Sequence, residues 1–297
     1  MKENALLELF YDYLKCNKKV SSNTFQAYKS DLASYYNYLD NCNLSELSAT
    51  CSDIEEFKSA LKDDGRATSS VSRCLSSVRA FYTFLLKSGV IIENPARAVK
   101  NDKTDTKQID ILTSDEIDTL IGQPSGGDEK SLRDRAILEL LYATGLKVSE
   151  LISLDCTDFN PTLSTIRCKS KAGLKDRVIP LYPRIKKLLT NYISHSRRYL
   201  VFDDEETALF VNINGSRMTR QGVWKLIKLY AENAGIQKEI TPCTLRHSFA
   251  THLLENGADV SLLCDVLGHS DISSTNIYVN ILKNKTNDSL LRFHPHA

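Results

Sequence analysis

The sequence lacks the long apolar runs and the short nucleotide- or metal-binding motifs that would place it directly in a membrane or cofactor class. No stretch approaches the roughly 18–20 apolar residues that a membrane-spanning helix needs. The first fifteen residues, MKENALLELFYDYLK, lack the basic, then apolar, then small-residue order of a signal peptide. No glycine-rich phosphate loop and no HExxH motif occur. We therefore expect a cytoplasmic protein without membrane contact.

The cysteines form no metal-binding or disulfide pattern. None lies in a CxxC pair, and none has histidines at zinc-finger spacing. In a reducing compartment we expect them to be small, mostly buried hydrophobic side chains. The sequence thus predicts no metal and no cofactor. The eight cysteines are Cys16, Cys42, Cys51, Cys74, Cys156, Cys168, Cys243 and Cys264.

The chain also lacks an excess of either charge. Its 38 Lys and Arg residues balance 37 Asp and Glu residues, which leaves a net charge of +1. A protein that coats nucleic acid would be strongly basic, but affinity for phosphates depends on local charge. Positive side chains are concentrated in residues 167–177. The overall balance therefore does not exclude a basic DNA-binding face.

The sequence does contain helical periodicity, in two blocks. Apolar residues recur at helical spacing through the first hundred residues, with capping residues or glycines between the runs. Residues 101–111 are polar and aperiodic, which is typical of a linker. The capping box of Thr113 and Glu116 then opens the second block. We predict a helical domain over residues 1–100 and a second domain over residues 112–297.

Only one region has strand character. Residues 164–168 and 177–181 each predict a short strand, and the connection between them is rich in lysine and contains glycine. This pattern indicates a β-hairpin within an otherwise helical second domain. The predicted fold class is therefore mainly α, with a small β-hairpin or sheet in an α+β second domain.

Four polar residues stand out near the C-terminus. Arg246 and His247 lie inside an apolar helix pattern that begins at Pro242, and such side chains are costly to bury unless they meet an anionic partner. Residues 267–270, Leu-Gly-His-Ser, predict a tight turn, and Tyr278 follows nine residues after its histidine. Each residue alone is a weak signal, because most His and Tyr residues on helices only pack.

In combination, four ordered segments resemble the tyrosine recombinase (phage integrase) family, over essentially the whole chain. YATGLKVSEL at 142–151 matches the segment of the first catalytic arginine, and SKAGLKDR at 170–177 matches the hairpin of the catalytic lysine. TLRHSFATHLL at 244–254 matches the box of the second arginine, and LGHS followed by Ile-Tyr matches the box of the nucleophile. The length, the helical first domain and the terminal His-Pro-His-Ala resemble XerC/XerD-type members in particular.

The resemblance implies an enzyme that cleaves and rejoins DNA through a 3′-phosphotyrosyl intermediate. Tyr278 would be the nucleophile, and Arg246 would hold the nonbridging phosphoryl oxygens. His269 would hydrogen-bond the same phosphoryl group or assist proton transfer. Lys171 would be the general acid that protonates the departing 5′ oxygen.

The resemblance also implies a DNA-binding surface. Residues 1–100 would be a SAM-like core-binding domain, and a tail from about residue 283 would dock on a neighbouring subunit. The hairpin has one residue more than the common family pattern, so Lys169 or Lys175 stays open as a substitute for Lys171. The side chains that we expect to contact DNA are Lys169, Lys175, Arg177, His247, Arg73 and Arg79.

Two positions depart from the family pattern. Lys147 stands where the first catalytic arginine is expected and keeps the charge but not the planar bidentate fork. Cys243 stands where histidine or lysine is expected, and a thiol is a weak donor without positive charge. Three explanations stay open: a slow but active recombinase, a site-binding or synapsis protein that relies on a partner for cleavage, or an engineered Lys147. Retained activity is favoured because Tyr278 and Lys171 are kept.

The partners that the resemblance implies are a double-stranded DNA target site and other recombinase subunits. The subunits would form a tetramer, either of identical chains or with a sister recombinase, and a septal DNA translocase is a further candidate. The length and the tail favour chromosome dimer resolution at a dif-like site. A mobile-element integrase or transposase is the alternative.

Overall fold

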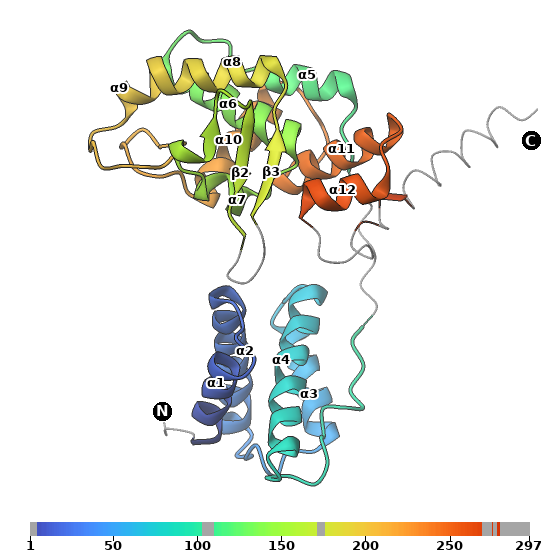
Figure 1. The fold of residues 1–297 in the computed structure, drawn as a ribbon. Coiled ribbons are helices and arrows are strands. Elements are labelled where there is room, and N and C mark those ends of the chain that lie inside the picture. The colour runs from blue at the N-terminus through green and yellow to red at the C-terminus, as the bar shows by residue number, and fades with distance from the viewer. Residues whose placement is uncertain (1–4, 103–109, 171–175, 269–274, 276–277, 280–297) are drawn as a thin grey trace, which may run out of the picture. The chain divides into compact units, whose positions relative to one another are not determined.

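The computed structural model describes residues 5–102, 110–170, 176–268, 275 and 278–279. The chain divides into two compact units between residues 107 and 108 (Figure 1). Each unit has its own cluster of buried apolar side chains. The secondary structure confirms the predicted fold class, since helices dominate and the described residues contain one small antiparallel sheet.

The described part of the first unit consists of helices whose ends follow the capping residues of the sequence. The Ser21 hydroxyl accepts a hydrogen bond from the Thr24 amide at the start of the second helix. In the core, the hydroxyls of Tyr35 and Tyr82 lie 2.7 Å apart in one hydrogen bond, and the Tyr82 hydroxyl donates a second one to the Glu46 carbonyl at 3.0 Å. The helices are α1 (Ala5–Cys16), α2 (Ser22–Asn41), α3 (Cys51–Asp63) and α4 (Thr68–Lys87).

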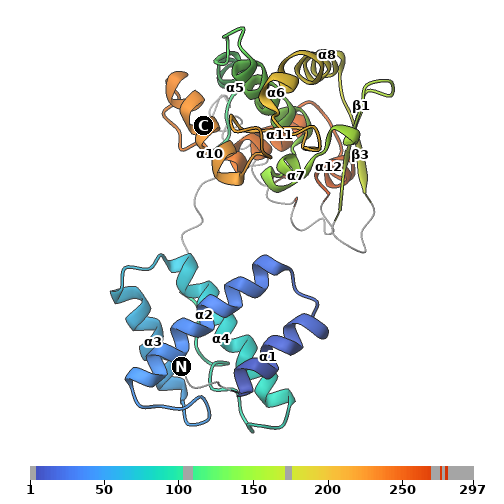
Figure 2. The same ribbon diagram turned by 90° about the vertical axis from the view of Figure 1, so that its left-hand side faces the viewer.

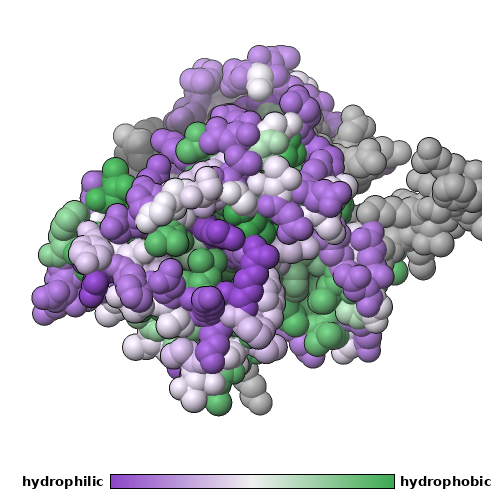
Figure 3. All heavy atoms as spheres, turned by 90° about the horizontal axis from the view of Figure 1, so that it is seen from above, coloured by the Kyte–Doolittle hydropathy of each residue, from purple (hydrophilic) through white to green (hydrophobic). Residues whose placement is uncertain are grey.

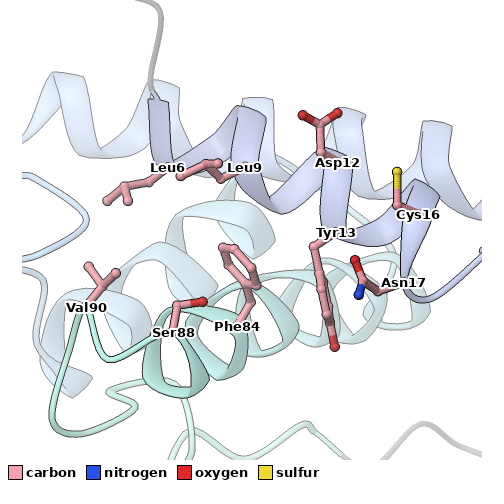
Figure 4. Close-up of a pocket in the computed structure, with 9 residues that line it drawn as sticks. All are labelled: Leu6, Leu9, Asp12, Tyr13, Cys16, Asn17, Phe84, Ser88 and Val90. Atoms are coloured by element: carbon pink, nitrogen blue, oxygen red, sulfur yellow. The ribbon is translucent and has the colours of Figure 1, made fainter.

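A shallow apolar groove runs between α1 and the C-terminal end of α4 (Figure 4). The rings of Tyr13 and Phe84 lie 5.1 Å apart across the two helices. Leu9 and Val90 also line the groove, and Leu9 is 57% exposed. The groove is therefore open to solvent and adds to the apolar surface of this unit.

The second unit is built around α6, which is buried along most of its length. The apolar side chains of α6 lie on several of its faces and pack into the core of the unit. Other helices surround it, and the face over α5 and α8 is mostly hydrophilic with isolated apolar side chains (Figure 3). The α-helices of this unit are α5 (Ser114–Gly122), α6 (Glu129–Thr144), α7 (Val148–Ser153), α8 (Pro183–Asn191), α9 (Arg198–Leu200), α10 (Arg220–Asn233), α11 (Pro242–Glu255) and α12 (Val260–Leu267). Shorter helical turns are η1 (Cys156–Asp158) and the π-helical η2 (Tyr192–Arg197).

The sheet of the second unit confirms the predicted hairpin and adds a short strand to it. The strands are β1 (Phe159–Asn160), β2 (Thr165–Cys168) and β3 (Arg177–Pro180), in the order β1-β2-β3 and all antiparallel. The inward-facing Ile166 and Ile179 pair across β2 and β3. Figure 2 shows β3 beside α12, so the hairpin approaches the C-terminal helices of the unit.

The prediction that the cysteines are mostly buried is wrong for half of them. Cys74, Cys168 and Cys264 are buried and Cys156 is half-buried. The others lie near helix ends, where side chains face solvent because no neighbouring element covers them. These exposed cysteines are Cys16, Cys42, Cys51 and Cys243.

Candidate active site

The guanidinium of Arg246 joins three helices of the second unit. Pro242 occupies the first turn of α11 and Thr241 caps it, which directs Arg246 toward the unit's interior. The residue is only 7% exposed, and its guanidinium donates hydrogen bonds to the carbonyls of Gly145 and Leu267 (the latter 2.8 Å). Burial lowers the pKa of the guanidinium, but arginine keeps its charge in proteins. The site thus holds a fixed cation at a helix junction.

Gly145 is required at this junction. It ends α6 in the left-handed conformation, with φ of 59°, and turns its carbonyl toward Arg246. A Cβ at this position would lie 2.5 Å from the Phe249 ring. Both the backbone conformation and the packing therefore favour glycine.

Tyr278 packs beside this cation. Its side chain lies in a small apolar cluster with Ala250, Leu254 and Leu263, and it is 3% exposed. The Tyr278 amide donates to the carbonyl of Thr275, whose hydroxyl oxygen lies 3.1 Å from the sulfur of Cys264 on α12. Burial raises the pKa of the Tyr278 phenol, while the charge of Arg246 and a hydrogen bond from it act in the opposite direction. In this state the phenol is therefore protonated and shielded from solvent.

The imidazole of His247 contacts the same phenol. The His247 Nδ1 atom lies 2.9 Å from the Tyr278 hydroxyl, and the ring centroids are 5.5 Å apart. Burial first, and the Arg246 charge second, lower the pKa of the His247 imidazole. In the described structure His247 lies against the proposed nucleophile, and its predicted contact with DNA stays a prediction.

Lys147 and Cys243 line one cavity with Arg246. Cys243 precedes Arg246 by three residues on α11, so the two side chains share a helix face. Lys147 caps α7 and is exposed, as is Cys243. The cavity, of about 420 Å³, is also lined by Arg220 and Trp224 of α10. The structure thus brings three of the six predicted catalytic residues to one cavity. Tyr278, a fourth, lies next to Arg246.

An ion pair that the sequence did not suggest links the hairpin to this site. Arg177 of β3 donates two hydrogen bonds to the Glu150 carboxylate of α7, at 2.9 and 2.8 Å, and a third to the Val266 carbonyl of α12. Burial opposes ionisation of Glu150, but the hydrogen bonds from Arg177 and from the Lys147 amide leave its pKa lowered. Arg177 therefore ties the hairpin to the elements that carry Lys147 and precede His269.

The remaining predicted residues fall into two groups. Lys171, Lys175 and His269 lie outside the described residues. The others are engaged within the chain: Lys169 pairs with Asp155 at 2.6 Å and Asp158 at 3.2 Å. In the first unit, Arg73 pairs with the buried Asp31 at 2.6 Å, and Arg79 donates to the carbonyls of Ala96 and Val99. Their predicted DNA contacts stay predictions.

Sequence reasoning missed the residues of α10 that face the cavity. Arg220, Gln221 and Trp224 occupy its first turns, and Trp224 is 43% exposed. The only local signal is the Thr219 cap of α10, which predicts a helix start but not what it faces.

No arrangement suited to a metal ion and no helix long and apolar enough to cross a membrane occurs among the residues that the structure describes.

Comparisons with known proteins match this architecture over its whole length. The phage integrase family model matches residues 110–285, and the model of the phage integrase N-terminal SAM-like domain matches residues 7–89. Tyrosine recombinase XerD of Oceanobacillus iheyensis is 43% identical over 296 residues, which cover 98% of each chain. Tyrosine recombinase XerD of Staphylococcus epidermidis is 39% identical over 295 residues, 99% of this chain and 100% of the relative.

Solved structures share the fold. The XerA recombinase is 26% identical, with a TM-score of 0.55 over 98% of both chains. The XerH site-specific recombinase, solved bound to a palindromic difH substrate, is 21% identical, with a TM-score of 0.76 over 89% of this chain and 78% of XerH. Together with the family model and the XerD relatives, the observed site residues lead to one conclusion: this chain belongs to the phage integrase family of tyrosine recombinases.

Proposed function

We propose that the chain is a Xer-type site-specific recombinase that cuts double-stranded DNA and rejoins it through a 3′-phosphotyrosyl bond on Tyr278. The observation that carries the proposal is the fixed Arg246 cation beside the phenol of Tyr278. This pair occurs in a chain that is 43% identical to a XerD protein over nearly its full length.

Arg246 serves to stabilise charge on the scissile phosphate. Attack on a phosphodiester builds negative charge on the nonbridging oxygens, and a preorganised cation in a partly dry site stabilises that charge. Two carbonyls already orient the Arg246 guanidinium, so little reorganisation is needed when the phosphate arrives. Lys147, on the same cavity, supplies a second cation.

Tyr278 attacks phosphorus, and the 5′ oxygen leaves. The new phosphotyrosyl bond conserves the bond energy, so the 5′ hydroxyl of another strand can reverse the step. Lys171 is the proposed acid that protonates the departing oxygen, with Lys169 or Lys175 as alternatives. His269 is proposed to bind the phosphoryl group, and it directly follows Gly268, where the Arg177 side chain packs closely.

The nucleophile must become accessible for this chemistry. A phenol that is 3% exposed does not reach a phosphodiester on an external duplex. The described arrangement is therefore a resting state, and DNA binding must expose the Tyr278 hydroxyl beside the preoriented Arg246.

A nicked suicide substrate carrying the target site tests the proposal. The protein should form a covalent protein–DNA adduct that migrates slowly in a denaturing gel, and Tyr278→Phe should form none. Lys147→Arg should form the adduct about 10-fold or more faster. Removal of one oxyanion-stabilising donor typically lowers the rate on the order of 10²–10³-fold, and Lys147 retains part of the stabilisation that an arginine would supply. A wild-type adduct that persists in Tyr278→Phe would exclude Tyr278 as the nucleophile.

A second candidate function follows from the cavity at Lys147 and Cys243. Both departures from the family pattern line this one cavity, so two groups around the phosphate are weakened together. The chain would then be a site-binding or synapsis protein that depends on a partner subunit for cleavage. Tight, specific DNA binding without an adduct, in wild type and in Lys147→Arg, would favour this function.

The biological role that we propose is chromosome dimer resolution at a dif-like site. The near-complete mutual coverage with XerD relatives supports it, and a mobile-element role is the alternative. We further propose a tetramer on DNA, with identical or sister subunits, and a septal DNA translocase as an additional partner. Residues 1–100 would clamp the DNA with the second domain, and residues from about 283 would dock on a neighbour. Sequencing the DNA cross-linked to the protein in cells distinguishes a single chromosomal site from dispersed element ends.

A further inference from the structure

The hydroxyl of Tyr278 needs a proton acceptor if it is to attack phosphorus. Burial raises the pKa of this phenol, so that it stays protonated at neutral pH. Arg246 lies against it but has no acceptor atom. Cys243 lines the same cavity, and its side chain carries no basic nitrogen. Arg246 and Cys243 therefore do not provide a nitrogen base here.

His247 has the required position. It follows Arg246 on α11, is half-buried, and its Nδ1 atom lies 2.9 Å from the phenolic oxygen. A base must lie within about 2.6–3.2 Å of the proton's heavy atom. The contact joins residues 31 positions apart, so it comes from the packing of the Tyr278 segment on α11.

The imidazole is also in the required form. Burial and the neighbouring Arg246 charge lower the pKa of His247, so the ring is neutral near pH 7. A neutral imidazole whose proton is on Nε2 accepts a hydrogen bond at Nδ1 from the phenol. The same ring can hold the proton once negative charge gathers at the neighbouring phosphate.

We propose that His247 is the general base for Tyr278. As the phenolic oxygen bonds to phosphorus, its proton passes to Nδ1 of His247, and the P–O5′ bond breaks with protonation of the 5′ oxygen by the hairpin lysine. In rejoining, the 5′ hydroxyl attacks phosphorus and gives its proton back to the hairpin lysine, the tyrosine oxygen leaves, and His247 returns the proton to it. This step rests on the proposed function, because it requires Tyr278 to be the nucleophile. It also requires the contact between His247 and the phenol to persist when DNA binding exposes the Tyr278 hydroxyl.

The test measures single-turnover adduct formation on the suicide substrate by His247→Ala and His247→Gln. With protein in excess, so that all the substrate is bound, both variants should cleave on the order of 10²-fold more slowly than wild type, since general base catalysis contributes about 10²–10⁴. Added imidazole should restore cleavage by His247→Ala at least several-fold. It should not help His247→Gln, whose amide fills the space.

A substrate with sulfur in place of the bridging 5′ oxygen separates the base from the acid. A thiolate leaves without protonation, so Lys171→Ala should regain most of its rate on this substrate. Both His247 variants should stay slow on it, because their defect is in the nucleophile.

The outcomes separate the two proposals. If Tyr278-dependent adducts form at the wild-type rate or faster in His247→Ala, His247 only holds the buried phenol in place. The general-base proposal is then wrong. A slow His247→Ala that imidazole does not rescue, or that the sulfur substrate restores, also overturns it. If neither wild type nor Lys147→Arg forms an adduct, the proposed function is wrong, and the general-base role of His247 is wrong as well.

Discussion

Removal of the Arg177 side chain should destabilise the second unit. Arg177 holds Glu150 with two hydrogen bonds and the Val266 carbonyl with a third, so one side chain joins β3, α7 and α12. The Arg177 and Glu150 side chains are only 14% and 18% exposed. Arg177→Ala would therefore leave a largely buried carboxylate without its cation.

The magnitude follows from this burial. Removing one partner of a fully buried ion pair costs about 3–5 kcal/mol. Partial solvent access and the remaining hydrogen bond from the Lys147 amide reduce that cost, so we expect a loss of about 2–3 kcal/mol in the free energy of unfolding. Arg177→Lys keeps the charge but not the fork, and we expect about half of that loss.

Trp224 provides the assay. It is the single tryptophan of the chain and lies on α10, so its fluorescence in urea follows the second unit alone. Arg177→Ala, Glu150→Gln and the double variant form a cycle, for which we expect a coupling energy above about 1 kcal/mol. If the two single losses add to within about 0.5 kcal/mol, the ion pair does not connect these segments and the reasoning is refuted.

Two further substitutions probe the backbone and the charges of this unit. Gly145→Ala should lower the free energy of unfolding by roughly 1–3 kcal/mol in the same fluorescence assay, because residue 145 has a positive φ and a Cβ there would meet the Phe249 ring. An unchanged urea midpoint would contradict this.

Hydrogen bonds from Lys169, and then from Arg217, hold the pKa of Asp155 at about 2, below the unfolded value of about 3.9. Its contribution to stability is present above about pH 4 and lost as the pH falls toward 2. Asp155→Asn should therefore be less stable than wild type at pH 7, and the difference should shrink below pH 4; a constant difference would contradict the pairing.

The long elements were predictable because their signals are local. The apolar repeat over residues 68–87 coincides with α4, and the capping box at Thr113 begins α5. The π-helical segment η2 and the two-residue strand β1 were not predicted. A two-residue strand has no periodicity, and a π-helix depends on the packing around it rather than on a local pattern.

Part of the candidate site could be predicted as residues but not as contacts; the residues of α10 were missed, and the catalytic roles stay predictions. The motifs identified Arg246 and Tyr278, and the structure places them together. The Arg177–Glu150 pair joins residues 27 positions apart, and neither has a local sequence signal for the other. The same holds for His247 and Tyr278, whose contact depends on how the Tyr278 segment packs on α11.

The two residues that depart from the family pattern line the same cavity. Lys147 and Cys243 are both shorter than the arginine and histidine that the pattern expects, and both line the cavity beside Arg246. Side chains that share a cavity and a ligand do not contribute additively. The increase in cleavage rate produced by Lys147→Arg therefore depends on the residue at position 243. In this chain it is measured beside a thiol, with His247 as the base that contacts the nucleophile. The effects of Lys147 and Cys243 on the rate should therefore be measured together with those of His247, which lies on the same helix as Cys243 and contacts the nucleophile.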